Sequence, residues 1–398
     1  MGLFSGISGN VLVLGLVSFF TDVSSEMIYP LLPMFVATLP GGSVAFLGLI
    51  EGAAETTAAL LKLVSGSYSD RVASRKGLVL WGYGVSAIAR PLIALATSPL
   101  GVLLVRMSDR VGKGVRTSPR DALIADSTPA SGRGKAFGFH RSMDHAGAVL
   151  GPLLASAALY LLANDLRMVF WLAAIPGLMA VILIILKVRE TPREVSSLSP
   201  AKRVLPGALP HGPIRGYLAI LLLFTLGNSS DAFLLLKASR TGMPASGVAL
   251  LWTAFHLVKM LATMPFGALS DRIGRKRVII CGWAVYAVSY CGFALAESRW
   301  QVCGVFLFYG IFYGLTEGVE KAFVADMAPS AQSGTAFGWY NLAIGVGALP
   351  ASLIFGAIWT WAGPAAAFSF GAGVAALAAL LLALLPIRIP AVEEGRHV

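Results

Sequence analysis

The chain has 398 residues, of which 56% are hydrophobic and 13% are charged. A soluble domain carries about a quarter charged residues, and here apolar runs of about 20 residues, long enough to cross a membrane, recur from end to end. The composition therefore excludes a soluble protein. The net charge of +11 does not indicate nucleic-acid binding, because lysine and arginine collect in the cytoplasmic loops of membrane proteins.

The apolar runs predict twelve transmembrane helices. The first six lie near residues 10–37, 45–69, 77–97, 100–125, 135–162 and 168–187. The second six lie near residues 215–239, 246–269, 277–296, 300–325, 334–361 and 364–387. We expect two helical domains, residues 1–187 and 215–398, joined by a flexible cytoplasmic linker at 188–214, whose proline and charge content does not favour folding alone.

Positive charge predicts the orientation. With both termini in the cytoplasm, the inner segments hold 17 basic residues and the outer loops only Arg167 and Arg299. This asymmetry places both termini inside. We expect a multi-pass protein of the cytoplasmic (inner) membrane that functions as a monomer.

The three cysteines lie in apolar runs without CxxC spacing, which predicts buried free thiols.

The two halves repeat each other. GSYSDRVASRK, from Gly66 to Lys76, returns as GALSDRIGRKR, from Gly267 to Arg277, at an offset of 201. The segment from Asp121 to Phe139 returns from Lys321 to Trp339 at an offset of 200. Internal duplication of this kind is typical of transporters, with the substrate site between the repeats near the membrane midplane.

These loops resemble the signature between helices 2 and 3 of the major facilitator superfamily, Gly-x-x-x-Asp-Arg/Lys-x-Gly-Arg/Lys-Arg/Lys. The second copy is complete, and the first departs at Ala73 and Ser74. The resemblance implies an all-α fold of two pseudo-symmetric six-helix bundles, and a transporter in place of an enzyme. It also implies a cytoplasmic latch, in which Asp70 faces a helix N-terminus of the other half and Arg71 pairs with Asp126. The gating residues it implies are Gly66, Asp70, Arg71, Asp126, Arg133, Gly267, Asp271, Arg272 and Asp326.

The fourth helix carries a row of charges. Most of these charges share one helical face, and a lipid-facing row would cost several kcal/mol per charge, so we expect it to face protein or a water-filled cavity. Arg110-Val-Gly-Lys113-Gly114 resembles the family motif Arg-x-x-Gln-Gly, which is associated with proton coupling. Arg110 is therefore the strongest single candidate.

The fifth helix contains Gly147, Gly151 and Pro152, which resemble the antiporter signature Gly-x-x-x-Gly-Pro and favour export. His140 and Asp144 lie one turn apart. They fit a proton relay or a hydrogen-bonded pair, or, with Glu26 or Glu51, a divalent metal site.

Acidic residues complete the set. Asp22 and Glu26, and likewise Glu51 and Glu55, are spaced four apart, so each pair shares a helix face. Each acid either pairs structurally with the basic row or handles protons or substrate. The residues expected in substrate or proton coupling are Asp22, Glu26, Glu51, Glu55, Arg106, Asp109, Arg110, Lys113, Arg116, His140, Asp144, Glu317 and Glu320. Because the N-terminal half carries the denser row, we expect the coupling chemistry mainly there.

The function expected first is proton-driven export of a small solute by alternating access, with the proton gradient as driving force and without a cofactor or a resident metal. The alternatives are uptake of an anionic metabolite on Arg106, Arg110, Lys113 and Arg116, and efflux of a divalent metal. The expected partners are a small-molecule or ion substrate and the lipid bilayer, and not nucleic acid. No nucleophile–base set points to an enzyme.

Overall fold

The computed structural model describes residues 7–41, 44–190, 208–209, 212–243 and 245–386, and within these ranges the chain is helical without strands. The N-terminal half contains α1 (Gly9–Glu26), η1 (Tyr29–Leu31), α2 (Leu32–Thr38), α3 (Val44–Ser69), α4 (Arg75–Leu92), η2 (Ile93–Leu95), α5 (Pro99–Asp126), η3 (Ala130–Gly132), α6 (Arg133–Leu161), α7 (Leu166–Leu172) and α8 (Ala174–Lys187). The C-terminal half contains α9 (Ile214–Gly227), α10 (Asp231–Arg240), α11 (Ala245–Ile273), α12 (Arg275–Leu295), α13 (Arg299–Met327), η5 (Ser330–Gln332) and α14 (Ser333–Leu384). Most of the expected linker lies outside the described residues.

These elements form twelve spans, as predicted, although several spans are broken. The first consists of α1, η1 and α2, which Pro30 and Pro33 interrupt because proline cannot donate a helical hydrogen bond. The seventh consists of α9 and α10, separated at residues 228–230. The long α14 holds the last two spans, which meet at Gly363, where φ is +87° and only glycine is unstrained.

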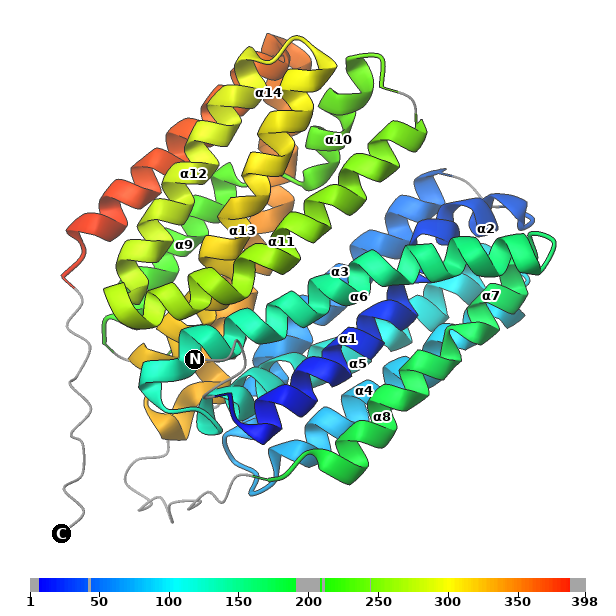
Figure 1. Ribbon diagram of the computed structural model, residues 1–398, viewed down its shortest axis with the longest axis horizontal. Helices are drawn as coiled ribbons and strands as arrows, with labels where there is room; N and C mark the ends of the chain where they lie inside the picture. The colour runs from blue at the N-terminus through cyan, green and yellow to red at the C-terminus, as the bar shows by residue number, and fades with distance from the viewer. Residues whose placement is uncertain (1–6, 42–43, 191–207, 210–211, 244, 387–398) are drawn as a thin grey trace.

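The two halves form two helical bundles that meet at one end and diverge at the other (Figure 1). They meet where the α3–α4 and α11–α12 loops lie, and they diverge towards α2 and α10. Across the contact, Gly138 of α6 packs on the backbone of Thr263 in α11, and Gly338 of α14 packs on that of Leu63 in α3. The basic loops assign the closed end to the cytoplasm, so this conformation faces outward.

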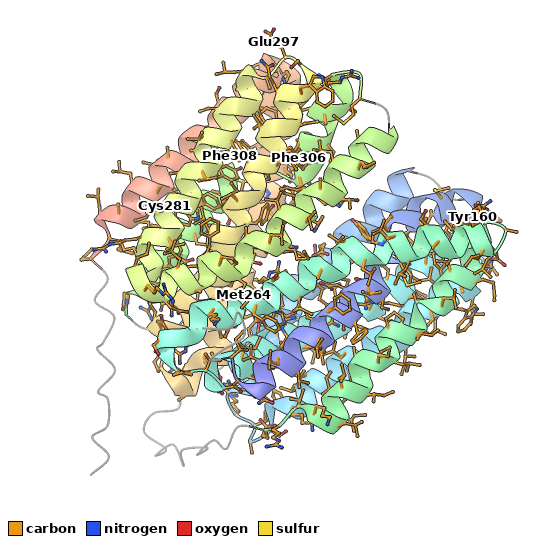
Figure 2. All side chains as sticks on the ribbon, viewed as in Figure 1. Tyr160, Met264, Cys281, Glu297, Phe306 and Phe308 are labelled. Atoms are coloured by element: carbon orange, nitrogen blue, oxygen red, sulfur yellow. The ribbon has the colours of Figure 1, made fainter. Side chains whose placement is uncertain are left out.

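The outer surface is apolar. Large side chains such as Leu186 and Leu349 point away from the bundles and are 69% and 67% exposed, a surface that suits lipid. By length and composition, six helical segments among the described residues could each cross a membrane. All three cysteines are free, but Cys281 and Cys291 are exposed, contrary to the predicted burial. Figure 2 shows Cys281 on the outer surface.

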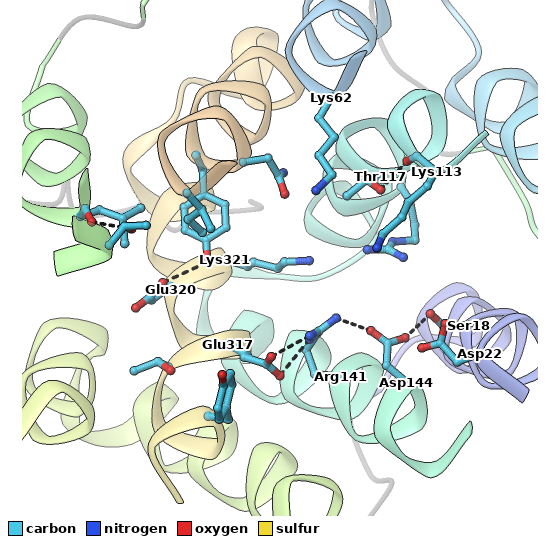
Figure 3. A pocket seen from close by; sticks show the side chains of 18 of the residues that line it. Ser18, Asp22, Lys62, Lys113, Thr117, Arg141, Asp144, Glu317, Glu320 and Lys321 are labelled. Carbon is cyan, nitrogen blue, oxygen red and sulfur yellow. Dashed lines mark hydrogen bonds and ion pairs between the residues drawn. The ribbon is translucent and has the colours of Figure 1, made fainter. Parts of the chain in front are cut away.

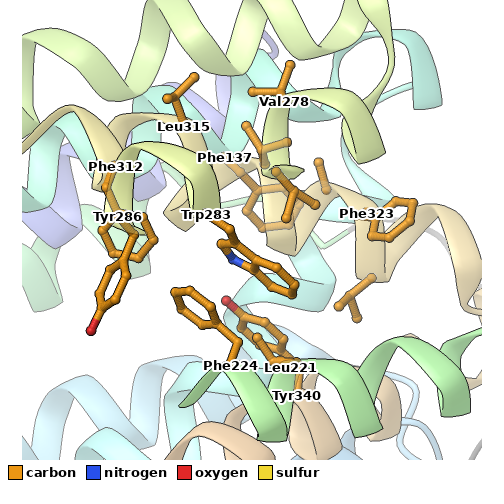
Figure 4. Close-up of a cluster of buried hydrophobic side chains, with 14 of the residues drawn as sticks. Phe137, Leu221, Phe224, Val278, Trp283, Tyr286, Phe312, Leu315, Phe323 and Tyr340 are labelled. Carbon is orange, nitrogen blue, oxygen red and sulfur yellow. The ribbon is translucent and has the colours of Figure 1, made fainter. Parts of the chain in front are cut away.

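The core of the C-terminal half is built from aromatic rings (Figure 4). Phe224 of α9 stacks on Trp283 of α12, with ring centroids 4.5 Å apart and nearly parallel planes. Tyr286 and Phe312 pack on the same Phe224 ring. Rings of this size bury much apolar area and hold few rotamers, so they give this half a rigid inner wall.

Candidate functional site

The cytoplasmic closure is a latch that occurs twice. In the first copy, the Asp70 carboxylate accepts hydrogen bonds from the backbone N–H groups of Gly334 (2.9 Å) and Thr335 (2.7 Å), at the N-terminus of α14. Gly66 permits this approach, because a Cβ there would collide with the carbonyl oxygen of Gly334. A carboxylate at a helix N-terminus is stabilised by the helix dipole and by unpaired N–H groups.

The second copy is equivalent. Asp271 accepts hydrogen bonds from the backbone N–H groups of Gly134 and Lys135, both at 2.9 Å, at the N-terminus of α6. Gly267 lies against the carbonyl oxygen of Gly134, as Gly66 lies against that of Gly334. Each half therefore holds a helix N-terminus of the other half, as the repeated motif predicts.

The arginine of the latch differs from the prediction. Arg75, and not Arg71, contacts Asp126 (2.6 Å), and it also contacts Asp70 (2.8 Å). Arg71 follows the end of α3 and is exposed, whereas Arg75 begins α4 and its side chain is buried. The motif alone does not predict which arginine is buried, because the chain turns between α3 and α4 and the two arginines lie on different sides of that turn.

In the second copy, too, the buried arginine is the one that begins the following helix. Arg275 contacts Asp271 and Asp326, while Arg272 is exposed. Arg133, from the N-terminal half, also contacts Asp326, at 2.9 Å. The Arg-Lys pair at 75–76, which returns at 275–276, was the sequence signal for the buried arginine.

The latch predicts a large effect for the replacement of one arginine and little effect for the other. Replacing Arg75 by alanine removes two ion pairs, and since breaking a buried pair costs about 3–5 kcal/mol, we expect a shift of at least tenfold towards the inward-facing state. Replacing Arg71 by alanine is the matched control and should change little. The measurement is the spin-label distance between cysteines introduced at the exposed positions Ala73 and Ile273, with the native cysteines replaced by serine. A lengthening in the Arg71 variant alone would contradict the assignment.

A central cavity of about 370 Å³ lies above the latch, between the halves (Figure 3). Helices α1, α3, α4, α5 and α6 line it from the N-terminal half, and α9, α13 and α14 from the other. It is lined by six basic residues, Lys62, Lys113, Arg116, Arg120, Arg141 and Lys321. It is also lined by four acidic residues, Asp22, Asp144, Glu317 and Glu320.

Ion pairs cross between the halves at the floor of this cavity. Arg141 of α6 contacts Glu317 of α13 at 2.8 Å and Asp144 of its own helix at 2.6 Å. His145 reaches the same Glu317 at 2.7 Å. Asp144 also accepts a hydrogen bond from Ser18 of α1. The network thus joins α1, α6 and α13.

A second crossing pair lies beside the first. Lys321 of α13 contacts Asp121 of α5 at 2.7 Å, and Arg120 contacts the other oxygen of Asp121 at 2.8 Å. Asp121 is fully buried. Sequence reasoning did not select Arg141, His145, Asp121 or Lys321 as site residues, although an ionisable residue within a span is itself a signal.

The row on α5 faces inward as predicted, and it is largely paired within the N-terminal half. Arg110, the strongest candidate from the sequence, contacts Glu55 at 3.2 Å. The Glu55 side chain is 55% exposed. Asp109 contacts Arg106 (3.5 Å) and Arg90 of α4 (2.9 Å). Arg110 and Glu55 therefore do not form a pair that crosses between the halves.

The glycines of the fifth-helix motif set the distance between α6 and α1. A Cβ on Gly147 would meet the carbonyl oxygen of Phe19 and the Cβ of Asp22, and one on Gly151 would meet the Cβ of Glu26. The motif thus packs directly on the stretch of α1 that carries both acids. Pro152 lies within α6.

The other predicted site residues lie outside the ion pairs that join the two halves. Glu320 accepts hydrogen bonds from Trp283 (3.1 Å) and Tyr340 (3.0 Å), both in the C-terminal half. His140 is fully buried, with Nδ1 3.8 Å from Asp144. No group of three or more His, Cys, Asp or Glu residues that could hold a metal occurs in the described part of the chain. The side chain of Glu51 lies outside the described residues.

The sequence matches the family model described as Major Facilitator Superfamily over residues 14–239 and 218–397. The MFS-type transporter MJ1317 of Methanocaldococcus jannaschii is 36% identical over 383 residues, covering 94% of each chain. The inner membrane transport protein YajR of Escherichia coli is 26% identical over 79% of this chain and 69% of its own.

Solved structures share the fold. The human organic anion transporter MFSD10 aligns with a TM-score of 0.78 at 18% identity, covering 94% of this chain and 99% of its own. The Escherichia coli fucose:proton symporter FucP aligns with a TM-score of 0.77 at 14% identity, covering 95% and 98%. Identities this low establish a similar fold and not a shared substrate.

Proposed function

The chain belongs to the major facilitator superfamily, and we propose that it is a proton-coupled transporter that exports a small solute across the cytoplasmic membrane by alternating access. The observation that carries this proposal is the pair of buried ion contacts between the halves, Arg141 with Glu317 and Lys321 with Asp121. Both lie at the cavity floor, which has to open when the transporter turns inward.

Proton binding is coupled to transport through these ion pairs. Separating buried ion partners leaves uncompensated charges, at a cost of about 3–5 kcal/mol. A proton on Glu317 removes its charge, so Arg141 keeps only Asp144 as a partner and the halves separate at lower cost. Proton binding therefore favours the inward-facing state, because a ligand shifts an equilibrium by its difference in affinity for the two states.

The direction of transport rests on the antiporter-like glycines of α6. Their close packing brings Asp22 and Glu26 beside the cavity-lining face of α6. Uptake of an anion is the second candidate, and the unpaired lysines of the central cavity favour it. The fucose:proton symporter FucP has the same fold, so proton coupling in either direction is compatible with this architecture.

Proton flux in proteoliposomes tests the proposal. A pH-sensitive dye is trapped inside, valinomycin and equal potassium clamp the membrane potential, and anionic, cationic and neutral solutes are added outside. Exchange of an entering solute for a proton makes the interior alkaline, whereas symport makes it acidic. We expect alkalinisation with at least one solute, absent from protein-free vesicles. If solutes cross without any proton movement, the coupling mechanism is wrong.

A further inference from the structure

Three cations of the central cavity form no ion pair with a carboxylate among the described side chains. Lys62 of α3 and Lys113 of α5 are half-buried, and neither ammonium group makes an ion pair or hydrogen bond within the described part of the structure. Arg116 is 5% exposed. Its guanidinium lies 4.3 Å from the centre of the Tyr83 ring and donates to Ser86 and to the Gly82 carbonyl oxygen.

The remaining charges of the cavity balance one another. Asp121 contacts both Arg120 and Lys321, while Arg141 has two acids, Asp144 and Glu317. These contacts neutralise the floor, which holds three bases and three acids. Of the acids that line the cavity, Asp22 and Glu320 remain, and Glu320 is turned towards Trp283 and Tyr340. Glu55, which contacts Arg110, also acts electrostatically on Lys62 and Lys113. An excess of positive charge is left on the N-terminal wall.

The two walls of the cavity differ in chemistry. Figure 3 shows Lys62 and Lys113 reaching into the space from one side, with Arg141 and Lys321 around it. The C-terminal half supplies nearly all the apolar lining, namely Leu221, Phe224, Phe312, Tyr313, Tyr340 and Ile344. Binding pockets commonly combine such an apolar wall with a few placed polar groups that fix the orientation of the ligand.

From this asymmetry we propose that the substrate is an organic anion with a flat apolar body. Its anionic group contacts Lys62, Lys113 and Arg116, and its apolar part lies against Phe312 and Ile344 on the opposite wall. An anion supplies these cations with an ion-pair partner, and charge-assisted hydrogen bonds are roughly twice as strong as neutral ones. The inference rests on the proposed function only in taking this cavity as the transport site.

Four small probes separate the contribution of the negative charge to affinity from that of the apolar rings. Naphthalenesulfonate carries both features, methanesulfonate only the charge, naphthalenesulfonamide only the rings, and a trimethylnaphthylammonium ion the opposite charge. Affinities for the purified full-length protein in detergent are measured by calorimetry. We expect naphthalenesulfonate to bind at least tenfold more tightly than each of the other three. Equal or tighter binding of the ammonium ion would overturn the proposal.

Substitutions in each wall of the cavity test which residues bind the charge and which bind the apolar body of the probe. Replacing Lys62 and Lys113 together by methionine should weaken naphthalenesulfonate at least tenfold, whereas arginine at both positions should retain most of the affinity. Lys187→Met, at the exposed end of α8, is the matched control. Ile344→Ala should weaken naphthalenesulfonate about threefold to tenfold and leave methanesulfonate unchanged, since only the former loses apolar contact. Undiminished binding in the folded double-methionine variant would refute the site.

The outcomes for this inference and for proton coupling are separable. If naphthalenesulfonate binds and crosses proteoliposomes without moving protons, the anion site stands and the coupling proposal falls. If a cationic solute moves protons and naphthalenesulfonate neither binds nor crosses, coupling stands and the anion site falls.

Discussion

Neutralising Glu317 is expected to uncouple the transporter. The Glu317→Gln variant loses the charge that binds Arg141 across the halves, while the amide keeps the size of the side chain. A loss of about 3 kcal/mol, the lower range for a broken buried pair, shifts the conformational equilibrium about 100-fold towards the inward-facing state. Solute-driven proton flux should fall to background, with solute exchange down its own gradient continuing. Proteoliposomes with a trapped pH dye and labelled solute measure both.

The control for this variant is the same substitution at Glu297, an exposed position in the loop before α13. Glu297→Gln should transport and couple as the unmodified protein does. Arg141→Gln should uncouple as well, since it removes the other partner. Full proton coupling in folded Glu317→Gln would exclude the crossing pair as the route by which protons act.

The sequence predicts most of the fold, because the features that define it are periodic or repeated. Apolar runs give the spans, and two loop motifs at nearly constant offset give the two halves. The latch follows from the same repeat, so Asp70 and Asp271 lie at opposite helix N-termini as expected. The breaks at residues 228–230 and at Gly363 depend on local backbone geometry and not on hydropathy.

The pairing of charges was less predictable. Charge spacing correctly places the α5 row inward, but it does not say which partner each charge meets. Arg110 meets Glu55 in its own half, whereas Arg141, separated from Glu317 by 176 residues, joins the two halves. The expectation that coupling lies mainly in the N-terminal half came from counting charges. Each crossing pair takes one partner from the C-terminal half, Glu317 in the first and Lys321 in the second.

Membrane potential should drive an exported anion strongly if it exchanges for a proton. A monoanion leaving while one proton enters moves two positive charges inward per cycle. At about 2.3 kcal/mol per charge per 100 mV, this contributes about 4.6 kcal/mol, or roughly 10³-fold in the equilibrium solute ratio. Electroneutral symport of the same proton and anion gives no response, and an uncoupled anion gives about 50-fold for its single charge.

The measurement is the distribution of labelled naphthalenesulfonate across proteoliposomes at equal pH on both sides. Valinomycin and a potassium gradient set the interior negative, and thermodynamics makes the ratio independent of protein orientation. Expulsion of roughly 10³-fold per 100 mV would support exchange, and Glu317→Gln should reduce it to the value for an uncoupled anion. A ratio that does not respond to potential would instead establish the second candidate function, uptake with a proton, because only then do the two charges cancel.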